Sequence, residues 1–153
     1  MPGQENSVGA HMRTVSCSVA VDDPLGRAVE LMYEHGLRQM PVMEHGRPVG
    51  MIYDRDLGMA ERLLGERWQE HAVAKLMSGI PYCTSPETPI AEVAHHLAIR
   101  SLEAAIVMVE ARIVGLFAVS DALLLLSRLA AGQGMPCVQP ATANVTTPRM
   151  GVG

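Results

Sequence analysis

Aromatic side chains are scarce in this sequence: one Trp, three Tyr and one Phe make up 3% of its 153 residues. A protein that binds nucleic-acid bases by stacking presents several exposed rings, so this scarcity disfavours that class of protein. The core must instead consist of aliphatic side chains and of the eleven methionines, whose flexible thioethers fill irregular spaces.

Charged residues are also few, at 18% of the chain, compared with about 25% in typical globular proteins. Together with the 48% of hydrophobic residues, this excludes intrinsic disorder for most of the chain. The formal net charge is −4. A general nucleic-acid binder relies on a basic surface to contact phosphates, so we expect no nucleic acid as the main partner.

Cysteines and long apolar runs are equally limited. The sequence has an odd number of cysteines, Cys17, Cys83 and Cys137, and no CxxC motif. This pattern argues against a disulfide framework and against a thiolate zinc site. The longest apolar run, residues 122–126, is too short to span a bilayer, and residues 1–12 lack the pattern of a signal peptide. We therefore expect a cytoplasmic protein with no membrane partner.

An internal repeat organises the chain. A shift of 65 positions aligns residues 8–57 with residues 73–122 without a gap, and ten of these fifty positions are identical, compared with about three expected by chance. The repeat predicts a first domain at residues 8–64, a linker at 65–72, a second domain at 73–131 and a flexible tail at 132–153. Because the linker is short, we expect the two copies to pack together.

Each copy shows the same order of patterns, β-α-β-β-α, which predicts an α+β fold. Asp23 is the expected N-cap of the first helix, Gly36 its stop, and His45-Gly46 the turn of a hairpin. The expected elements of the first copy lie at residues 17–21, 24–35, 39–43, 48–53 and 54–64, and those of the second at 82–85, 89–100, 104–109, 112–118 and 119–130.

Four short patterns occur in both copies: V-x-x-x-M, D/E-x-P-[LI], R-x-V-G and a terminal Asp. From residue 8 to about residue 130, the chain resembles two cystathionine-β-synthase (CBS) domains in tandem, an arrangement called a Bateman module. The resemblance implies a stand-alone regulatory module that senses AMP, ADP, ATP or S-adenosylmethionine in a cleft between its domains and forms a homodimer. It also implies that the protein acts on a separate target protein, requires no cofactor and is not an enzyme.

The ligand motif of this family is a glycine, a few apolar residues, a Ser or Thr, two further residues and an Asp. It falls on residues 50–56 and 115–121, so the resemblance makes Asp56 and Asp121 the expected ribose ligands. A carboxylate can accept both hydroxyl hydrogens of a ribose. An acid in the first turn of a helix also stabilises the helix without any ligand, and this alternative stays open for both residues.

Both copies depart from the motif at the hydroxyl position, where Tyr53 and Ala118 stand. In the first copy Arg55 is a candidate phosphate donor, and in the second copy Ser120 offers a hydroxyl. By resemblance, the adenine would be lined by residues that precede the hairpin turns, namely Pro41, Val42, Ile106 and Val107. Because of the departures, the alternative function is a ligand-free interaction or dimerisation scaffold with degenerate nucleotide pockets.

The remaining candidates have simpler explanations. The adjacent His95 and His96 do not share a helix face, so we expect exposed positions and no metal site. Cys17 and Cys83 are expected to be small buried residues beside the first strands. The leucines at 123–126 and 129 cover most of a helix, which predicts a helix-mediated dimer interface. No motif of a catalytic nucleophile or of a phosphate-binding loop is present.

Overall fold

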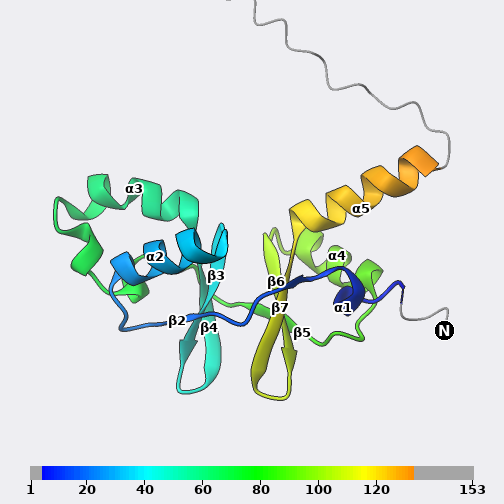
Figure 1. The fold of residues 1–153 in the computed structure, drawn as a ribbon, viewed down its shortest axis with the longest axis horizontal. Helices are drawn as coiled ribbons and strands as arrows, with labels where there is room; N and C mark the ends of the chain where they lie inside the picture. Colours follow the sequence, from blue (N-terminus) through cyan, green and yellow to red (C-terminus); the bar gives the residue numbers. More distant parts are fainter. Residues whose placement is uncertain (1–4, 133–153) are drawn as a thin grey trace, which may run out of the picture. The chain divides into compact units, whose positions relative to one another are not determined.

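The computed structural model describes residues 5–132, so the tail expected at 132–153 lies outside the described residues except for Gly132. The chain divides into two units, one up to Ala122 and one from Leu123 onward. The first unit holds two β-sheets with their helices (Figure 1). The expected α+β fold is confirmed.

The first sheet has the order β2-β3-β4, formed by β2 (Val19–Ala20), β3 (Gln39–Glu44) and β4 (Arg47–Tyr53). Strands β2 and β3 are parallel, and β3 and β4 form an antiparallel hairpin. The hairpin turn has positive φ at both His45 (48°) and Gly46 (74°), the backbone that two-residue hairpin loops favour. The predicted turn is therefore confirmed.

Two helices belong to this first copy, α2 (Leu25–His35) and α3 (Asp54–Leu64). Gly36 ends α2 in the left-handed conformation, as predicted. The prediction of Asp23 as N-cap is wrong, because Pro24 takes the N-cap position with an extended backbone. The helix begins one residue later than expected, and the Asp23 carboxylate instead accepts the Ala20 N–H at 2.8 Å.

The second sheet has the order β1-β7-β6-β5. Strand β5 (Tyr82–Thr84) is parallel to β6 (Ala104–Val109), which forms a hairpin with β7 (Arg112–Ala118). Helices α4 (Ile90–Ile99) and α5 (Val119–Gly132) complete the second copy. Both hairpins shift register at equivalent places, after Val42 and after Val107, so the sequence repeat is also a structural repeat.

The segment at the start of each copy packs on the sheet of the other copy. Residues 7–14, here called the N-terminal arm, contain α1 (Val8–His11) and β1 (Arg13–Thr14), and β1 pairs with β7 of the second copy (Figure 1). The Val8 N–H donates to the Thr88 carbonyl at 2.9 Å. The first copy receives the equivalent segment, residues 73–78, which follows η1 (Trp68–Glu70) and begins with η2 (Val73–Lys75).

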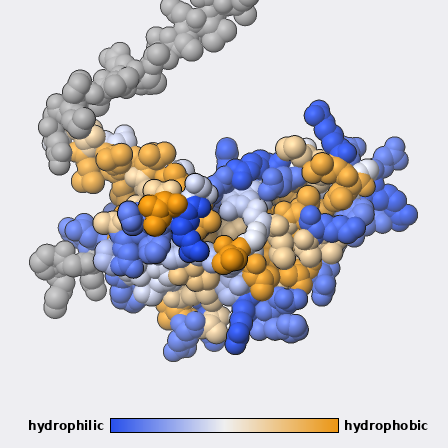
Figure 2. Space-filling view, turned by 180° about the vertical axis from the view of Figure 1, so that it is seen from behind, coloured by the Kyte–Doolittle hydropathy of each residue, from blue (hydrophilic) through white to orange (hydrophobic). Residues whose placement is uncertain are grey.

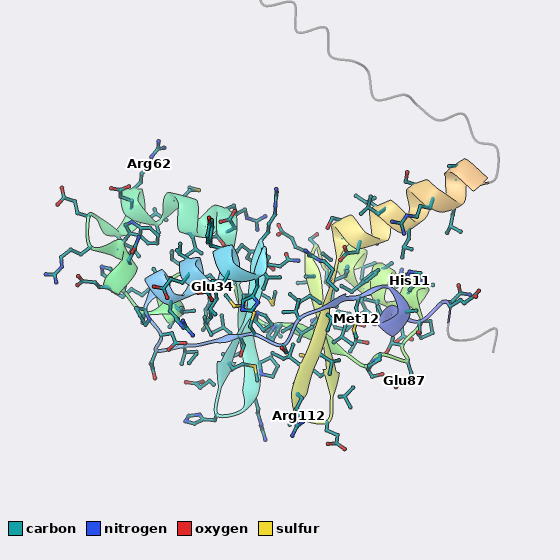
Figure 3. All side chains as sticks on the ribbon, viewed as in Figure 1. His11, Met12, Glu34, Arg62, Glu87 and Arg112 are labelled. Atoms are coloured by element: carbon teal, nitrogen blue, oxygen red, sulfur yellow. The ribbon has the colours of Figure 1, made fainter. Side chains whose placement is uncertain are left out.

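Two equivalent glycines allow these close contacts. A Cβ atom on Gly50 would lie 2.5 Å from the Ser78 carbonyl oxygen, and one on Gly115 would lie 2.8 Å from the Arg13 carbonyl oxygen. Met12, which Figure 3 labels beside the second copy, also contacts Gly115. Gly50 and Gly115 are among the identical residues of the repeat, and their lack of a side chain allows the segment from the other copy to pack closely on the strand.

One hydrophobic cluster joins the two copies. Side chains of both sheets belong to it, including Val42 and Ile52 from the first and Ile106 and Leu116 from the second. All four are fully buried. The expected packing of the two copies as a pair is confirmed. Within residues 5–132, no helix is long and apolar enough to cross a bilayer.

Candidate functional site

The first-copy site is the junction between β4 and α3. Tyr53 ends the strand and is the N-cap residue of the helix, and the Asp54 N–H donates to the Arg38 carbonyl at 2.8 Å. The side chain of Tyr53 is buried, and the guanidinium carbon of Arg55 lies 4.9 Å from the centre of its ring. This distance is within the range of a cation–π contact, so Arg55 covers a ring that stands at the motif's hydroxyl position.

Arg55 also reaches the other copy. Its guanidinium donates a hydrogen bond to the carboxylate of Glu103, the residue immediately before β6, and forms an ion pair with it. This hydrogen bond raises the pKa of Arg55. Burial, followed by the negative charge of Glu103, raises the pKa of Tyr53. The ion pair therefore links the predicted phosphate donor of the first copy to an acid of the second.

Asp56, the expected ribose ligand, is the third residue of α3. Its side chain is 31% exposed and lies 3.9 Å from the Nε atom of Arg55. The structure thus brings Tyr53, Arg55 and Asp56 together at one end of α3, and adds Glu103, which the repeat pattern alone did not single out.

The second-copy site is arranged differently. The Asp121 carboxylate accepts the N–H of Ala118 at 2.8 Å. Asp121 is the third residue of α5 and Ala118 is the residue just before the helix, so this is the hydrogen bond of a helix N-cap. The same carboxylate oxygen lies 3.7 Å from the Nε atom of Arg13, a residue of the N-terminal arm. Ser120 is exposed and Ala118 is buried. Asp121 therefore has a structural role that Asp56 lacks among the contacts of the described residues.

The four residues expected to line the adenine lie in the two central strands. Pro41 and Val42 lie in β3, and Ile106 and Val107 lie in β6. All four are buried. Val42 and Ile106 belong to the shared hydrophobic cluster, so their side chains already contribute to the packing of the two copies. Their contact with a ligand stays a prediction.

Two expectations about other side chains are wrong. His95 is exposed as expected, but His96 is half-buried because the ring of Tyr82 lies 5.0 Å from its own ring. Cys17 is half-buried, whereas Cys83 is exposed on β5, which is an edge strand of the second sheet. Desolvation of the partly buried sulfur atoms raises the pKa of both thiols, although Cys83 as a residue is exposed. Cys137 lies outside the described residues. Within the described part of the chain, no three His, Cys, Asp or Glu residues are placed to hold a metal ion.

Comparison with known proteins gives consistent results. Residues 8–60 match the CBS domain family. No match to the sequence is found among curated proteins. Among solved structures, AcuB of Vibrio cholerae, described as an acetoin utilization protein, is similar with 20% identity and a TM-score of 0.65, over 83% of this chain and 94% of that one.

Two further similar structures contain a nucleotide. One is the CBS domain of a bacterial CNNM/CorC family Mg²⁺ transporter in complex with ATP, with 22% identity and a TM-score of 0.64 over 78% of this chain and 86% of that one. The other is CBSX2 in complex with AMP, with 19% identity and a TM-score of 0.61 over 80% of this chain and 97% of that one.

The protein is a tandem-repeat α+β protein in which two small domains pack against each other. The two equivalent sheets, the exchanged segments and the similar structures all support this class. Residues 8–60 match the CBS domain family, and the described chain has the fold of the CBS-domain structures to which it is similar. The resemblance found in the sequence is confirmed.

Proposed function

We propose that this protein is a regulatory module that binds an adenosine-containing ligand between its two CBS domains and passes the signal to a separate target protein through the geometry of a homodimer. The candidate ligands are AMP, ADP, ATP and S-adenosylmethionine. The cysteine pattern of the sequence favours a cytoplasmic location for this activity.

The observation that carries the proposal is the placement of Asp56. It stands at the aspartate of the family motif, on the first turn of α3, with a partly exposed carboxylate. A carboxylate in this setting can accept the two hydrogens of a ribose diol. The fold is the one in which two of the similar structures hold ATP or AMP, which supports the same class of ligand.

We place the ligand at the first-copy site. Asp121, its equivalent in the second copy, already accepts the Ala118 N–H and lies near Arg13. A ribose there would have to compete with these contacts, whereas among residues 5–132 the contact of the Asp56 carboxylate is the longer one with Arg55, at 3.9 Å. The proposal therefore gives one ligand per chain.

Calorimetry with AMP, ATP and S-adenosylmethionine tests the proposal. Asp56→Ala should weaken binding by about 1.5 to 3 kcal/mol, the range of a hydrogen bond to a charged group. Asp54→Ala is the matched control, since it removes an exposed acid from the same helical turn and should leave the affinity nearly unchanged. Equal affinity of the wild type and the Asp56→Ala variant contradicts the ribose role.

The alternative is an interaction scaffold without a ligand. The engagement of Asp121 as a helix cap favours it for the second copy. If none of these ligands binds the wild-type protein while a dimer forms, the scaffold replaces the sensing proposal.

A surface for the homodimer is available on α5. Leu123, Leu124, Leu126 and Leu129 are each more than half exposed. Figure 2 shows the helix as a band of hydrophobic residues. Exposed apolar surface of this kind is typical of protein–protein contacts, and its leucines support helix-mediated dimerisation.

A further inference from the structure

The contact between Arg55 and Glu103 bears on which adenosine ligand the proposed site accepts. Arg55 is the cation of the first turn of α3, where its neighbours Asp54 and Asp56 are acids. Its guanidinium is held by the Glu103 carboxylate of the second copy and lies over the ring of Tyr53. The proposed phosphate donor is therefore already paired with an anion that belongs to the protein itself.

The fold does not require an acid at position 103. The Glu103 carbonyl accepts the Val119 N–H at 2.9 Å and thereby fixes the start of α5. The equivalent residue of the first copy is Arg38, whose carbonyl accepts the Asp54 N–H at 2.8 Å and fixes the start of α3 in the same way. Because a residue of opposite charge performs the same backbone role, the Glu103 side chain is free to serve the site.

A phosphate arriving at Arg55 would meet the acidic side chains that neighbour it, namely Asp54, Asp56 and Glu103. To bond Arg55 it would displace Glu103, whose side chain is 42% exposed and whose charge would remain close by. The repulsion between like charges a few ångströms apart would then oppose the new bond, together with that of Asp56. A ligand with an uncharged or cationic group at the ribose 5′ position avoids this repulsion.

We propose that Glu103 is a specificity-determining residue that keeps Arg55 from binding phosphate, so that the first-copy site prefers adenosine or S-adenosylmethionine to phosphorylated adenosine ligands. The ligand preference rests on the proposed function. The pairing of Arg55 by Glu103 is a property of the chain itself and can be measured without a nucleoside.

The experiment compares the affinities of adenosine, AMP and inorganic pyrophosphate for four full-length proteins: wild type, E103Q, R55Q/E103Q and the control E110Q. Glu110 is an exposed acid in the β6–β7 turn, so its change removes the same charge from the opposite end of β6. Glu103→Gln keeps the backbone carbonyl and the size of the side chain, and circular dichroism checks that each variant is folded.

We expect the wild type to bind adenosine more tightly than AMP. E103Q should tighten AMP and pyrophosphate about five- to tenfold while changing adenosine less than about twofold. The gain should disappear in R55Q/E103Q and should be absent in E110Q. A double-mutant comparison of this kind isolates the Arg55–Glu103 pair from the general change in net charge.

The outcomes separate the two proposals. If E103Q does not bind pyrophosphate more tightly than the wild type, the role of Glu103 is overturned, whatever adenosine does. If E103Q gains pyrophosphate affinity but neither adenosine nor AMP binds any variant, the nucleoside-sensing function fails while the control of Arg55 by Glu103 stands. If the wild type prefers AMP to adenosine and the preference is the same in E103Q, the specificity role is refuted.

Discussion

Substitution of Gly50 by Ala adds a single methyl group, yet it should destabilise the protein strongly. The new Cβ atom would lie 2.5 Å from the Ser78 carbonyl oxygen, closer than such atoms approach in proteins. Ser78 cannot easily move away, because its N–H donates to the Met51 carbonyl at 2.7 Å and its carbonyl accepts the Met51 N–H at 3.2 Å.

The magnitude follows from these contacts. Overpacking of a well-filled site costs about 1 to 3 kcal/mol, and loss of one of the two hydrogen bonds adds about 0.5 to 1.5 kcal/mol. We therefore expect Gly50→Ala to lower the free energy of unfolding by about 1.5 to 4.5 kcal/mol. This leaves a folded protein if the stability is typical of single domains, about 5 to 15 kcal/mol.

Urea denaturation measures this change, with Gly58→Ala as the matched control. Gly58 lies within α3, and a Cβ atom there would meet nothing within 4 Å. Alanine should therefore stabilise the helix at this position by up to about 1 kcal/mol. If Gly50→Ala is as stable as the wild type, residues 73–78 do not lie on β4 as described, and the account of the exchanged segments is refuted.

Three further changes have defined outcomes. Asp121→Ala should lower the free energy of unfolding by about 1 to 2 kcal/mol, because the cap of α5 loses its acceptor; an unchanged urea midpoint would contradict this. Because the pKa of Tyr53 is raised in the folded state, folding favours its neutral phenol. Its contribution to the free energy of unfolding is therefore fully present below the ordinary pKa of 10 and is lost as the pH rises above that value. Tyr53→Phe should therefore flatten the alkaline loss of stability in urea titrations, whereas Tyr33→Phe at an exposed position should flatten it less. Serine at both Leu124 and Leu126 should convert the proposed dimer into a monomer by light scattering, and a wild type that is already monomeric would contradict the dimer.

Local chemistry accounts for the parts of the fold that the sequence predicted well. The hairpin at His45-Gly46 and the helix stop at Gly36 follow from backbone angles that few residues adopt. The start of α2 was misplaced because Asp is a preferred N-cap residue and Pro a preferred first residue of a helix, so the pair Asp23-Pro24 predicted a helix beginning at Pro24. In the structure Pro24 is itself the N-cap.

Contacts between distant parts of the chain could not be predicted in this way. The Arg55–Glu103 pair joins residues of different copies, and no spacing rule relates a charge on one helix to an acid before a distant strand. The same holds for Arg13 beside Asp121. The repeat did contain one usable sign. Met12 and Met77 are identical between the copies, and each lies next to the equivalent glycine of the other copy, Gly115 and Gly50 respectively.

The N-terminal arm has a consequence for the order in which the chain can fold. Its strand β1 pairs with β7, about a hundred residues further along the sequence. During synthesis the arm leaves the ribosome well before its partner strand, which is made only after both hairpin turns. Docking of the arm must therefore be a late event, since closing so long a loop has a high entropic cost until the second sheet exists. Until then the apolar side of the arm, with the fully buried Val8, is exposed to other nascent chains.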